Sequence, residues 1–394
     1  MRVLGLVVEY NPFHNGHLHH LQQARIACAP DLTVAVMSGN FTQRGEPAIM
    51  DKWARTEIAL SLGVDLVLEL PTAWAVRSAG DFAMGAILHL QSFGVTHLCF
   101  GSESNDLVAM MRLAREQNRE SVTYRATLHR NLSQGSTFAR AKAAALEEST
   151  GLAISAPNDI LGMAYLAALE KLSCPIVPVA IKRIGSGYHD TDYRAAIASA
   201  TAIRRGISHG GILDNLPIPA KTLEIIRRES EIGRAPIFWD AFTEPLRYQL
   251  RRLSASELAT LPDMEVGLPH RLANLPGVFP DIEDLVTQIK TKRYTWTRLQ
   301  RILVYTLLGL TADKLKQIHS AGPTYLRVLG LRRDKSHLLN DLARTLPLVY
   351  TPSELPDDPS MRLDAFATDV YAMGFPELSQ RHKGQDYTRQ VVVR

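Results

Sequence analysis

The opening segment of the chain, LGLVVEYNPFHNGHLHHLQQA, joins an apolar run directly to a helical one, and it constrains the fold more than any other feature. Val3–Val8 predicts a buried strand, Pro12 lies in a tight loop, and His14-Asn15-Gly16-His17 opens a helix. Unpaired N–H groups and the positive dipole end favour anions at such a first turn. Gly16 removes a side chain where a base or ribose would meet the helix. The segment therefore predicts a site that binds and activates a nucleotide.

The composition describes a soluble globular chain. With 394 residues, 46% of them hydrophobic and 21% charged, it is long enough for two or three domains. The formal net charge of +4 is too small by itself to indicate a nucleic-acid-binding protein. The charge is distributed unevenly, however. Residues 281–344 include twelve basic and six acidic residues, a net charge of +6, so the rest of the chain has a net charge of −2. One basic region is therefore expected in the second half of the chain.

Three scattered cysteines, Cys28, Cys99 and Cys174, form no Cys-X-X-Cys pair. They predict a reducing compartment, taken to be the cytoplasm, and argue against disulfides or structural zinc. The N-terminus runs directly into the first strand without a small-residue cleavage site, so a signal peptide is not expected. No apolar run approaches the roughly 20 residues of a membrane span, so we expect no membrane partner.

Short apolar strands alternate with helical segments from Met1 to about Ile184, which predicts an α/β fold with a doubly wound parallel sheet. Ligands bind at the carboxyl ends of such strands, so the polar segments that follow them should converge on one cleft. These segments are Gly39-Asn40, Glu69-Leu70-Pro71 and Gly101-Ser102-Glu103. The expected strands are Val3–Val8, Leu32–Met37, Leu66–Leu70, His97–Phe100 and Ile176–Ala180.

Strand signals fade after Gly206 and amphipathic helices follow. We therefore expect a catalytic α/β domain over residues 1–206 and a mainly helical region over residues 207–394. The basic stretch KTKRYTWTRLQR in that region interleaves cations with Tyr294 and Trp296, which suits phosphate contact and base stacking. The expected RNA contacts are Lys290, Lys292, Arg293, Arg298 and Arg301.

His14 and His17 are the candidate catalytic residues. Their imidazoles could donate to phosphate oxygens and stabilise charge that builds on a pentavalent phosphorus. The alternative is that both are helix-start residues satisfied by backbone carbonyls. His19 and His20 lie further into the helix and are expected at the surface.

The loop MSGNFTQRGEPAIMDKWAR follows the second strand and is a candidate substrate loop through Asn40, Gln43 and Arg44, with Lys52 and Arg55 nearby. Arginine makes bidentate contacts with carboxylates and phosphates, so this loop could clamp either. The alternative is a solvated loop with an ordinary salt bridge to Glu46 or Asp51, in which Asp51 and Trp53 cap and pack the next helix.

A second phosphate clamp is expected opposite the histidines, because both ends of a cleaved α–β phosphate bond must be neutralised. The segment SATAIR supplies Ser199, Thr201 and Arg204 for it, and Lys182-Arg183-Ile184 adds cations after the last strand. Gly101 would let the backbone approach a base or sugar. Asn158 begins a helix and could contact the nucleotide or serve only as an N-cap.

HNGH together with SATAIR resembles the HIGH-type nucleotidyltransferase superfamily, whose sheet is Rossmann-like. The resemblance extends to the bacterial tRNA(Met) cytidine acetate ligase family and covers most of the chain, up to Leu331. It is carried by VVEYNPFHNGHLHHL, MSGNFTQRGEPAIMDKWAR, GVDLVLELP, FGSES, PNDILGMAYL, KRIGSGYHD, SATAIR and YLRVLGL.

This resemblance implies an enzyme that uses ATP and acetate, not acetyl-CoA, to form N4-acetylcytidine at the wobble position of elongator tRNA(Met). It implies acetyladenylate as the intermediate, with release of pyrophosphate and then AMP. Mg²⁺ is expected as the charge neutraliser on the triphosphate, although no acidic cluster marks a dedicated metal site. The implied ATP contacts are Val7, Val8, Glu9, Tyr10, Asn11, Pro12, Phe13, His14, Asn15, Gly16, His17, Leu18, Gly101, Asn158, Arg183 and Ile184.

Two other functions stay open at this point. An adenylyltransferase that makes a dinucleotide or coenzyme precursor would use the same nucleotide site without an RNA surface. A non-catalytic tRNA-binding protein with a relic nucleotide fold is opposed by the presence of both phosphate clamps. The residues themselves identify no general base for the attacking amine.

Overall fold

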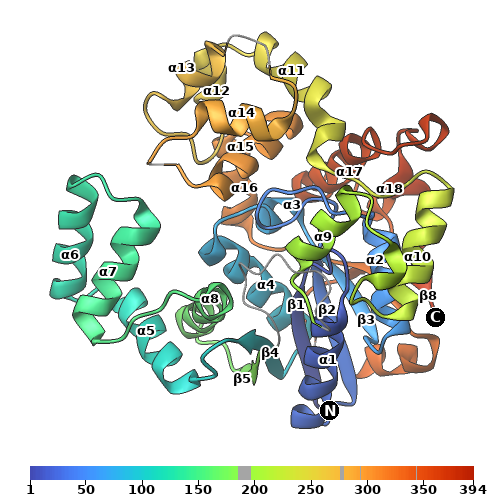
Figure 1. Cartoon of the computed structure of the whole chain (residues 1–394). Coiled ribbons are helices and arrows are strands. Elements are labelled where there is room, and N and C mark those ends of the chain that lie inside the picture. Colours follow the sequence, from blue (N-terminus) through green and yellow to red (C-terminus); the bar gives the residue numbers. More distant parts are fainter. Residues whose placement is uncertain (185–196, 276–278, 293, 343) are drawn as a thin grey trace.

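The computed structural model describes residues 1–184, 197–275, 279–292, 294–342 and 344–394. Within them, one eight-stranded sheet has the order β5-β4-β1-β2-β3-β6-β7, with β8 beside β6 (Figure 1). The first five strands are parallel and β6 runs antiparallel to β3. The strands are β1 Val3–Val8, β2 Leu32–Ser38, β3 Leu66–Leu70, β4 His97–Ser102, β5 Val177–Lys182, β6 Leu326–Leu331, β7 Leu348–Val349 and β8 Val392–Val393.

Helices cover both faces of the sheet, so the predicted doubly wound α/β fold and its five strands are confirmed. The α-helices are α1 Asn15–Cys28, α2 Lys52–Ser61, α3 Thr72–Ala75, α4 Ala79–Phe93, α5 Leu107–Arg119, α6 Val122–Ser133, α7 Phe138–Thr150, α8 Pro157–Lys171, α9 Ala200–Ser208, α10 Ala220–Glu231, α11 Thr243–Arg252, α12 Ala255–Leu258, α13 Leu268–Ala273, α14 Ile282–Ile289, α15 Trp296–Leu308, α16 Ala312–Ala321, α17 Pro359–Ala372 and α18 Gln385–Thr388. Short 3-10 helices cover Leu213–Asn215, Trp239–Phe242, Arg333–Asp341, Pro352–Glu354 and Leu378–Gln380.

The sheet is buried on both faces, and its central strands are mostly apolar, with Thr33, Ser38 and Glu69 as buried polar exceptions. In β2, Val34 and Val36 face one core with α4 and α8, whereas Ala35 and Met37 face another with α1 and α2. Such continuous apolar runs are typical of parallel strands covered by helices on both sides. The strand order reverses at β1, which pairs with β4 on one side and β2 on the other, and this places a crevice at their carboxyl ends.

The second half of the chain forms a helical core but also returns to the sheet. Helices α11, α13, α14 and α15, at the top of Figure 1, pack around a second core, which also includes Phe41, Ala73 and Val76 from the first half of the chain and residues of α17. The predicted boundary at residue 206 falls inside α9, and β6, β7 and β8 all come from the region expected to be helical. The terminal VVVR forms β8 against β6. The two-domain division stays a prediction, and the second half is not helical throughout.

A buried ion network fastens the C-terminal segment to the sheet. Lys52 Nζ lies 2.8 Å from Glu69 on β3 and 2.7 Å from Asp386 on α18, and Arg327 on β6 lies 3.2 Å from Asp386. Burial alone would lower the pKa of Lys52, but Asp386 and Glu69 raise it above its ordinary value. The lysine is therefore charged and fully paired inside the protein.

Replacement of Lys52 by Met should leave Glu69 and Asp386 buried without their shared cation. We expect a loss of about 3–5 kcal/mol in the free energy of unfolding, measured by urea denaturation at pH 7. Arg362→Ala, which removes an exposed arginine paired with Asp357, is the control and should change it by less than about 1 kcal/mol. Equal effects of the two substitutions would contradict the role given to the network.

Candidate functional site

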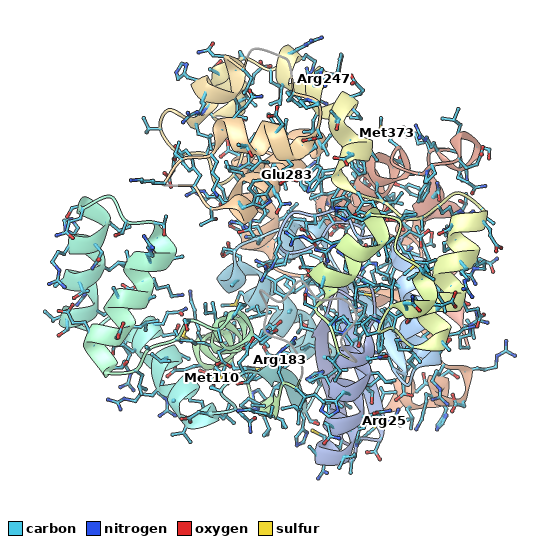
Figure 2. The ribbon with its side chains drawn as sticks, viewed as in Figure 1. Arg25, Met110, Arg183, Arg247, Glu283 and Met373 are labelled. Atoms are coloured by element: carbon cyan, nitrogen blue, oxygen red, sulfur yellow. The ribbon has the colours of Figure 1, made fainter. Side chains whose placement is uncertain are left out.

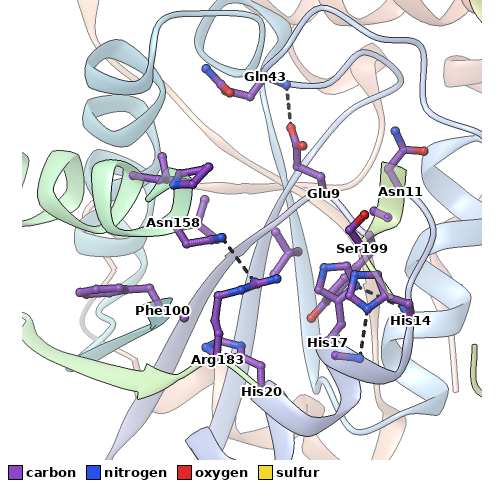
Figure 3. Close-up of a pocket in the computed structure, with 18 of the residues that line it drawn as sticks. Glu9, Asn11, His14, His17, His20, Gln43, Phe100, Asn158, Arg183 and Ser199 are labelled. Atoms are coloured by element: carbon purple, nitrogen blue, oxygen red, sulfur yellow. Dashed lines mark hydrogen bonds between the residues drawn. The ribbon is translucent and has the colours of Figure 1, made fainter. Parts of the chain in front are cut away.

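A cavity of about 430 Å³ opens at the carboxyl ends of β1, β4 and β5, beside the first turns of α1, α8 and α9 (Figure 3). It collects segments that lie far apart in the chain. Of the three polar segments expected to converge on one cleft, only Gly101 lines the cavity, whereas Gly39-Asn40 and Glu69-Leu70-Pro71 do not, so that prediction is wrong for two of the three segments. Seventeen of the expected site residues line it: Val7, Val8, Glu9, Tyr10, Asn11, His14, Gly16, His17, Gln43, Arg44, Gly101, Asn158, Arg183, Ile184, Ser199, Thr201 and Arg204.

Four expected ATP contacts lie outside the lining of this cavity. Pro12 and Phe13 are buried, and the Phe13 ring packs against Tyr10 behind the histidine loop. The backbone N–H of Asn15 donates to the carbonyl of Pro217 at 3.0 Å, and Leu18 packs against the core under α1. These residues support the loop and the helix that carry the two histidines.

The two imidazoles are held by reciprocal hydrogen bonds at the start of α1. His14 is the N-cap, and its Nδ1 accepts from the backbone N–H of Gly16 at 3.0 Å. The Nδ1 of His17 accepts from the backbone N–H of His14 at 3.3 Å. Because both Nδ1 atoms are acceptors, each neutral ring carries its proton on Nε2. Neither Nε2 has a hydrogen-bond partner among the described residues, so both can donate to a ligand (Figure 3).

Burial keeps both rings uncharged. Burial, together with the nearby charges of Arg183 and Arg204, lowers the pKa of His14 to about 3. Burial also lowers the pKa of His17 well below its ordinary value, helped by His14 and Arg183. The two rings stack with centroids 3.7 Å apart, which two cations would not tolerate. The histidines are therefore neutral hydrogen-bond donors near pH 7, while the arginines supply the positive charge.

The structure corrects the predicted anion-binding mode of the first helical turn. The N–H of Gly16 is taken by His14, and the N–H groups of Asn15 and His17 donate to the carbonyls of Pro217 and His14. These groups were expected to be unpaired and are not. An anion in the cavity would instead meet the two Nε2–H groups.

Gly16 is required for a different reason from the one expected. A Cβ at this position would lie 2.8 Å from Cε1 and 3.0 Å from Nδ1 of the His14 ring. The glycine therefore makes room for the capping imidazole, and a nearby base or ribose is not needed to explain it.

The opposite wall of the cavity presents Arg183, which lies between α8 and α1 (Figure 2). Its Nη1 lies 3.4 Å from Oδ1 of Asn158, and a Cβ on Gly101 would come within 3.2 Å of its Cγ. Both the backbone and side-chain nitrogens of Asn158 donate to Glu103 Oε1. The N-cap of α8 is Ala156, so Asn158 is a positioned cavity residue and the N-cap alternative is wrong.

The SATAIR segment forms the start of α9 and reaches the cavity from a third side. Ser199 is the N-cap and accepts from the N–H of Ala202 at 3.1 Å. Arg204 donates to the carbonyl of Asn11 at 2.9 Å and to Glu46 at 2.5 Å. This arginine thus ties α9 to the loop before the histidines and is already oriented toward the cavity.

The predicted substrate loop divides into two parts. Gln43 and Arg44 line the cavity, and the N–H of Gln43 donates to Glu9 at 2.6 Å (Figure 3). Asn40 does not line it: the side chain is buried, accepts from the N–H of Lys52 and donates to Thr368. The predicted substrate contact of Asn40 is therefore wrong. Its short amide side chain lies in a buried turn, where it forms hydrogen bonds within the protein.

Two cations near this loop are also structural. Arg55 is buried and donates to the carbonyls of Glu9, Ser38 and Gly39, so it fixes the strand ends rather than a substrate. Lys52 belongs to the buried ion network. Asp51 caps α2 by accepting from Ala54, as its alternative role predicted.

His19 and His20 were expected at the surface, and this expectation is wrong. Both line the cavity, and burial lowers the pKa of His20 to about 4. His20 Nε2 lies 3.6 Å from Sγ of Cys99 on β4. The signal was available in the spacing, because His17 and His20 are three residues apart and share one helix face.

The basic stretch at residues 290–301 is less open than predicted. Lys290 and Lys292 are exposed, but Arg301 is buried and pairs with Asp263 at 3.3 Å. Arg298 pairs with Glu265 and donates to the carbonyl of Asp263, and Tyr294 is buried in the helical core. Arg301 is therefore not an exposed RNA contact. Arg293 lies outside the described residues.

The donor chemistry of the cavity bears on the expected Mg²⁺. Among the described lining residues the carboxylates are Glu9 and Glu46, and Glu46 pairs with Arg204. Glu9 accepts from Gln43, and burial raises its pKa. The described part of the chain also contains no group of three metal-ligating side chains. None of its helices is long and apolar enough to cross a membrane.

The low pKa of His14 should appear in the pH dependence of stability. Below pH 6.5 the unfolded chain binds a proton that the folded protein excludes until about pH 3, so the free energy of unfolding falls as the pH drops through this window. In His14→Asn the amide can still cap Gly16 without titrating. When the pH drops from 7 to 5, the free energy of unfolding, measured by urea denaturation, should fall by about 2 kcal/mol less in His14→Asn than in the unsubstituted protein.

The exposed His337 provides the control for this measurement. His337→Asn should keep the pH dependence of the unsubstituted protein. The same pH dependence in His14→Asn and in the unsubstituted protein would mean that His14 is not held neutral.

Comparisons with known proteins agree with this geometry. The model of the HIGH Nucleotidyl Transferase family matches residues 1–386. The tRNA(Met) cytidine acetate ligase of Geobacillus sp. (strain WCH70) is 40% identical over 392 residues, covering 96% of each chain. The enzyme of the same name from Acetivibrio thermocellus is 36% identical over 414 residues, covering all of both chains.

Solved structures show the same similarity. The crystal structure of apo Thermotoga maritima TmcAL matches with a TM-score of 0.94 and 36% identity, and TmcAL bound with alpha-thio ATP matches with 0.92 and 35%. Each match covers 100% of this chain and 99% of the other. A family match over nearly the whole length, with relatives at this identity, shows that the chain belongs to the tRNA(Met) cytidine acetate ligase family of HIGH nucleotidyl transferases.

Proposed function

We propose that this protein is an ATP-dependent acetate ligase that forms N4-acetylcytidine at the wobble position of elongator tRNA(Met), in the cytoplasm. The observation that carries the proposal is the pair of neutral imidazoles whose free Nε2–H groups belong to one cavity with Arg183 and Arg204. The names of its relatives support the substrate, and the alpha-thio ATP complex of TmcAL supports the nucleotide.

In the first step a carboxylate oxygen of acetate attacks the α-phosphorus of ATP. The bond between this phosphorus and the bridging oxygen breaks, giving acetyladenylate and pyrophosphate. Negative charge on the phosphoryl oxygens increases in the transition state, and the Nε2–H groups of His14 and His17 are suited to stabilise it. Arg183 and Arg204 are suited to hold the triphosphate from the other walls of the cavity.

In the second step the N4 amine of cytidine attacks the acetyl carbonyl and AMP leaves with its phosphate oxygen. Free acetate is a poor acylating agent, whereas AMP is a good leaving group, so this chemistry needs no acetyl-CoA. The target amine lies on the pairing edge of a base in a single-stranded loop, which can be splayed into a cavity.

Mg²⁺ would enter this site with ATP. Because the lining carboxylates Glu9 and Glu46 are engaged with Gln43 and Arg204, phosphate oxygens and water are the better ligands for the ion. Bound there, it would neutralise charge on the triphosphate.

The proposal is tested by acetate-dependent exchange of labelled pyrophosphate into ATP, followed by addition of unmodified elongator tRNA(Met) and mass spectrometry of its nucleosides. We expect exchange and N4-acetylcytidine. Exchange without acetylcytidine would point to another acceptor for the activated acetate. Absence of both would favour an adenylyltransferase that makes a dinucleotide or coenzyme precursor.

His17→Asn is the sharpest test of the imidazole role, because the amide can accept from the N–H of His14 but cannot reproduce both donor and ring. We expect the exchange rate to fall by about 10²–10³-fold while tRNA binding is kept. His337→Asn, at an exposed position, should leave the exchange rate unchanged. An unchanged rate in His17→Asn would rule out the catalytic assignment.

The exposed pair Lys290 and Lys292 is the part of the predicted RNA surface that remains open. In the Lys290→Ala/Lys292→Ala variant we expect weaker tRNA binding and a smaller salt dependence, with acetate-dependent exchange intact. Filter binding at several salt concentrations measures the first two. Equal damage to binding and exchange would contradict a separate RNA surface.

A further inference from the structure

A helical hairpin formed by α6 and α7 projects from the body of the protein, at the left of Figure 1. Its helices pack mainly on each other, and α7 also packs on α5. The seam between them is small, and its buried members include Tyr124, Thr127, Ala141 and Leu146. Tyr124, Ala145 and Leu146 join the core on one face of the sheet, whereas much of the remaining surface of the hairpin faces solvent.

The hairpin has an unusual charge distribution. From Ser121 to Leu146 the sequence contains no aspartate or glutamate, but it contains Arg125, Arg130, Arg140, Lys142 and His129. The whole chain, by contrast, has almost balanced charges. The two acidic residues of the hairpin, Glu147 and Glu148, lie in the last turn of α7, and Glu148 pairs with Arg130. The rest of this projecting element therefore carries a local positive potential that the net charge of +4 does not reveal.

The arginines of the hairpin include side chains that protein contacts do not occupy. Arg125 and Arg140 are exposed, and neither guanidinium has an ion-pair or hydrogen-bond partner among the described residues. Arg125 and His129 are four residues apart and share one face of α6. Arg130 differs, because it pairs with Glu148 at 2.5 Å. The free arginines are therefore available to an anionic partner.

Helix α5 connects the hairpin to the rim of the cavity and carries further exposed arginines, with the exposed Asp106 as its N-cap. Arg112 and Arg119 on this helix are exposed, whereas Met110 faces α8 (Figure 2). α5 begins just after Glu103, whose carboxylate holds the cavity residue Asn158. Thirteen helical residues span about 20 Å, so α5 carries the hairpin to roughly this distance from the rim of the cavity.

We infer that the α6–α7 hairpin binds the phosphate backbone of the tRNA stem next to the loop that enters the cavity. The inference rests on the proposed function. A loop base in the cavity requires its double-stranded stem to leave across the protein surface, and duplex RNA is recognised mainly through its shape and backbone. Exposed arginines without partners among the described residues, on an element that α5 connects to the cavity, meet that requirement.

The test is the double variant Arg125→Ala/Arg140→Ala in the full-length protein. Binding of unmodified elongator tRNA(Met) is measured by filter binding at several salt concentrations, and acetate-dependent pyrophosphate exchange is measured in parallel. We expect the Kd for tRNA to rise about tenfold or more. The slope of log affinity against log salt should fall by about 1.5, because each lost phosphate contact contributes about 0.7–0.9. The exchange rate should stay unchanged.

A matched control removes the same charge elsewhere. Arg227 on α10 and Arg362 on α17 are exposed and pair with Asp214 and Asp357. The variant Arg227→Ala/Arg362→Ala should keep the tRNA affinity of the unsubstituted protein. Arg125→Lys/Arg140→Lys keeps the charge and should restore most of the affinity, which a purely structural role of the arginines would not predict.

The outcomes separate this inference from the proposed function. Unchanged tRNA affinity in the hairpin variant, with acetylation by the unsubstituted protein, would overturn the inference alone and would turn attention to a protein partner for the hairpin. Loss of exchange in the hairpin variant would also overturn it, because the hairpin would then act through folding. Absence of acetylcytidine with the unsubstituted protein would count against the proposed function, while the binding measurements would still decide the role of the hairpin.

Discussion

The parallel pairing of β1 with β4, where the strand order reverses, is the constraint on which the rest of the site depends. Polar segments leave the sheet at one edge because the strands are parallel, and they leave a crevice because the connections diverge at β1. Val8, Gly101 and Ile184 meet there although they are far apart in the chain. The helices that follow β1 and β4 then supply the imidazoles and position the wall that carries Asn158.

Within that crevice, burial affects the charge of histidine and arginine side chains differently. An imidazole loses its proton when it is desolvated near arginines, and it keeps the ability to donate through Nε2. A guanidinium stays charged in the same surroundings. In the proposed reaction, Arg183 and Arg204 would surround the polyphosphate with fixed charge, and the two imidazoles would place neutral, oriented donors where the charge changes. Reciprocal backbone hydrogen bonds keep the two rings in one tautomer.

The C-terminal segment completes the sheet and supports the loop of residues 37–55 that was predicted to bind the substrate. Asp386 and Thr368 contact Lys52 and Asn40 across more than three hundred residues of sequence. Tyr371 on α17 donates to the carbonyl of Ala48 in the same loop at 2.6 Å. The loop that presents Gln43 and Arg44 is thus held by residues from the other end of the chain. The helical region also packs directly on the first half of the chain, through Phe41, Ala73 and Val76.

The sequence by itself determined the five parallel strands, the helix start at His14, the capping serine of SATAIR and the cavity to which they contribute, because these features depend on local periodicity and on residues that cap or break helices. The tertiary structure alone decided which polar side chains face the cavity. Asn40, Lys52, Arg55 and Arg301 have the composition of binding residues, yet each is buried with a partner that is distant in sequence or is backbone. His20 reached the cavity because the helix packs with that face toward β4. Spacing along a chain fixes which side chains share a face, but only packing determines what that face meets.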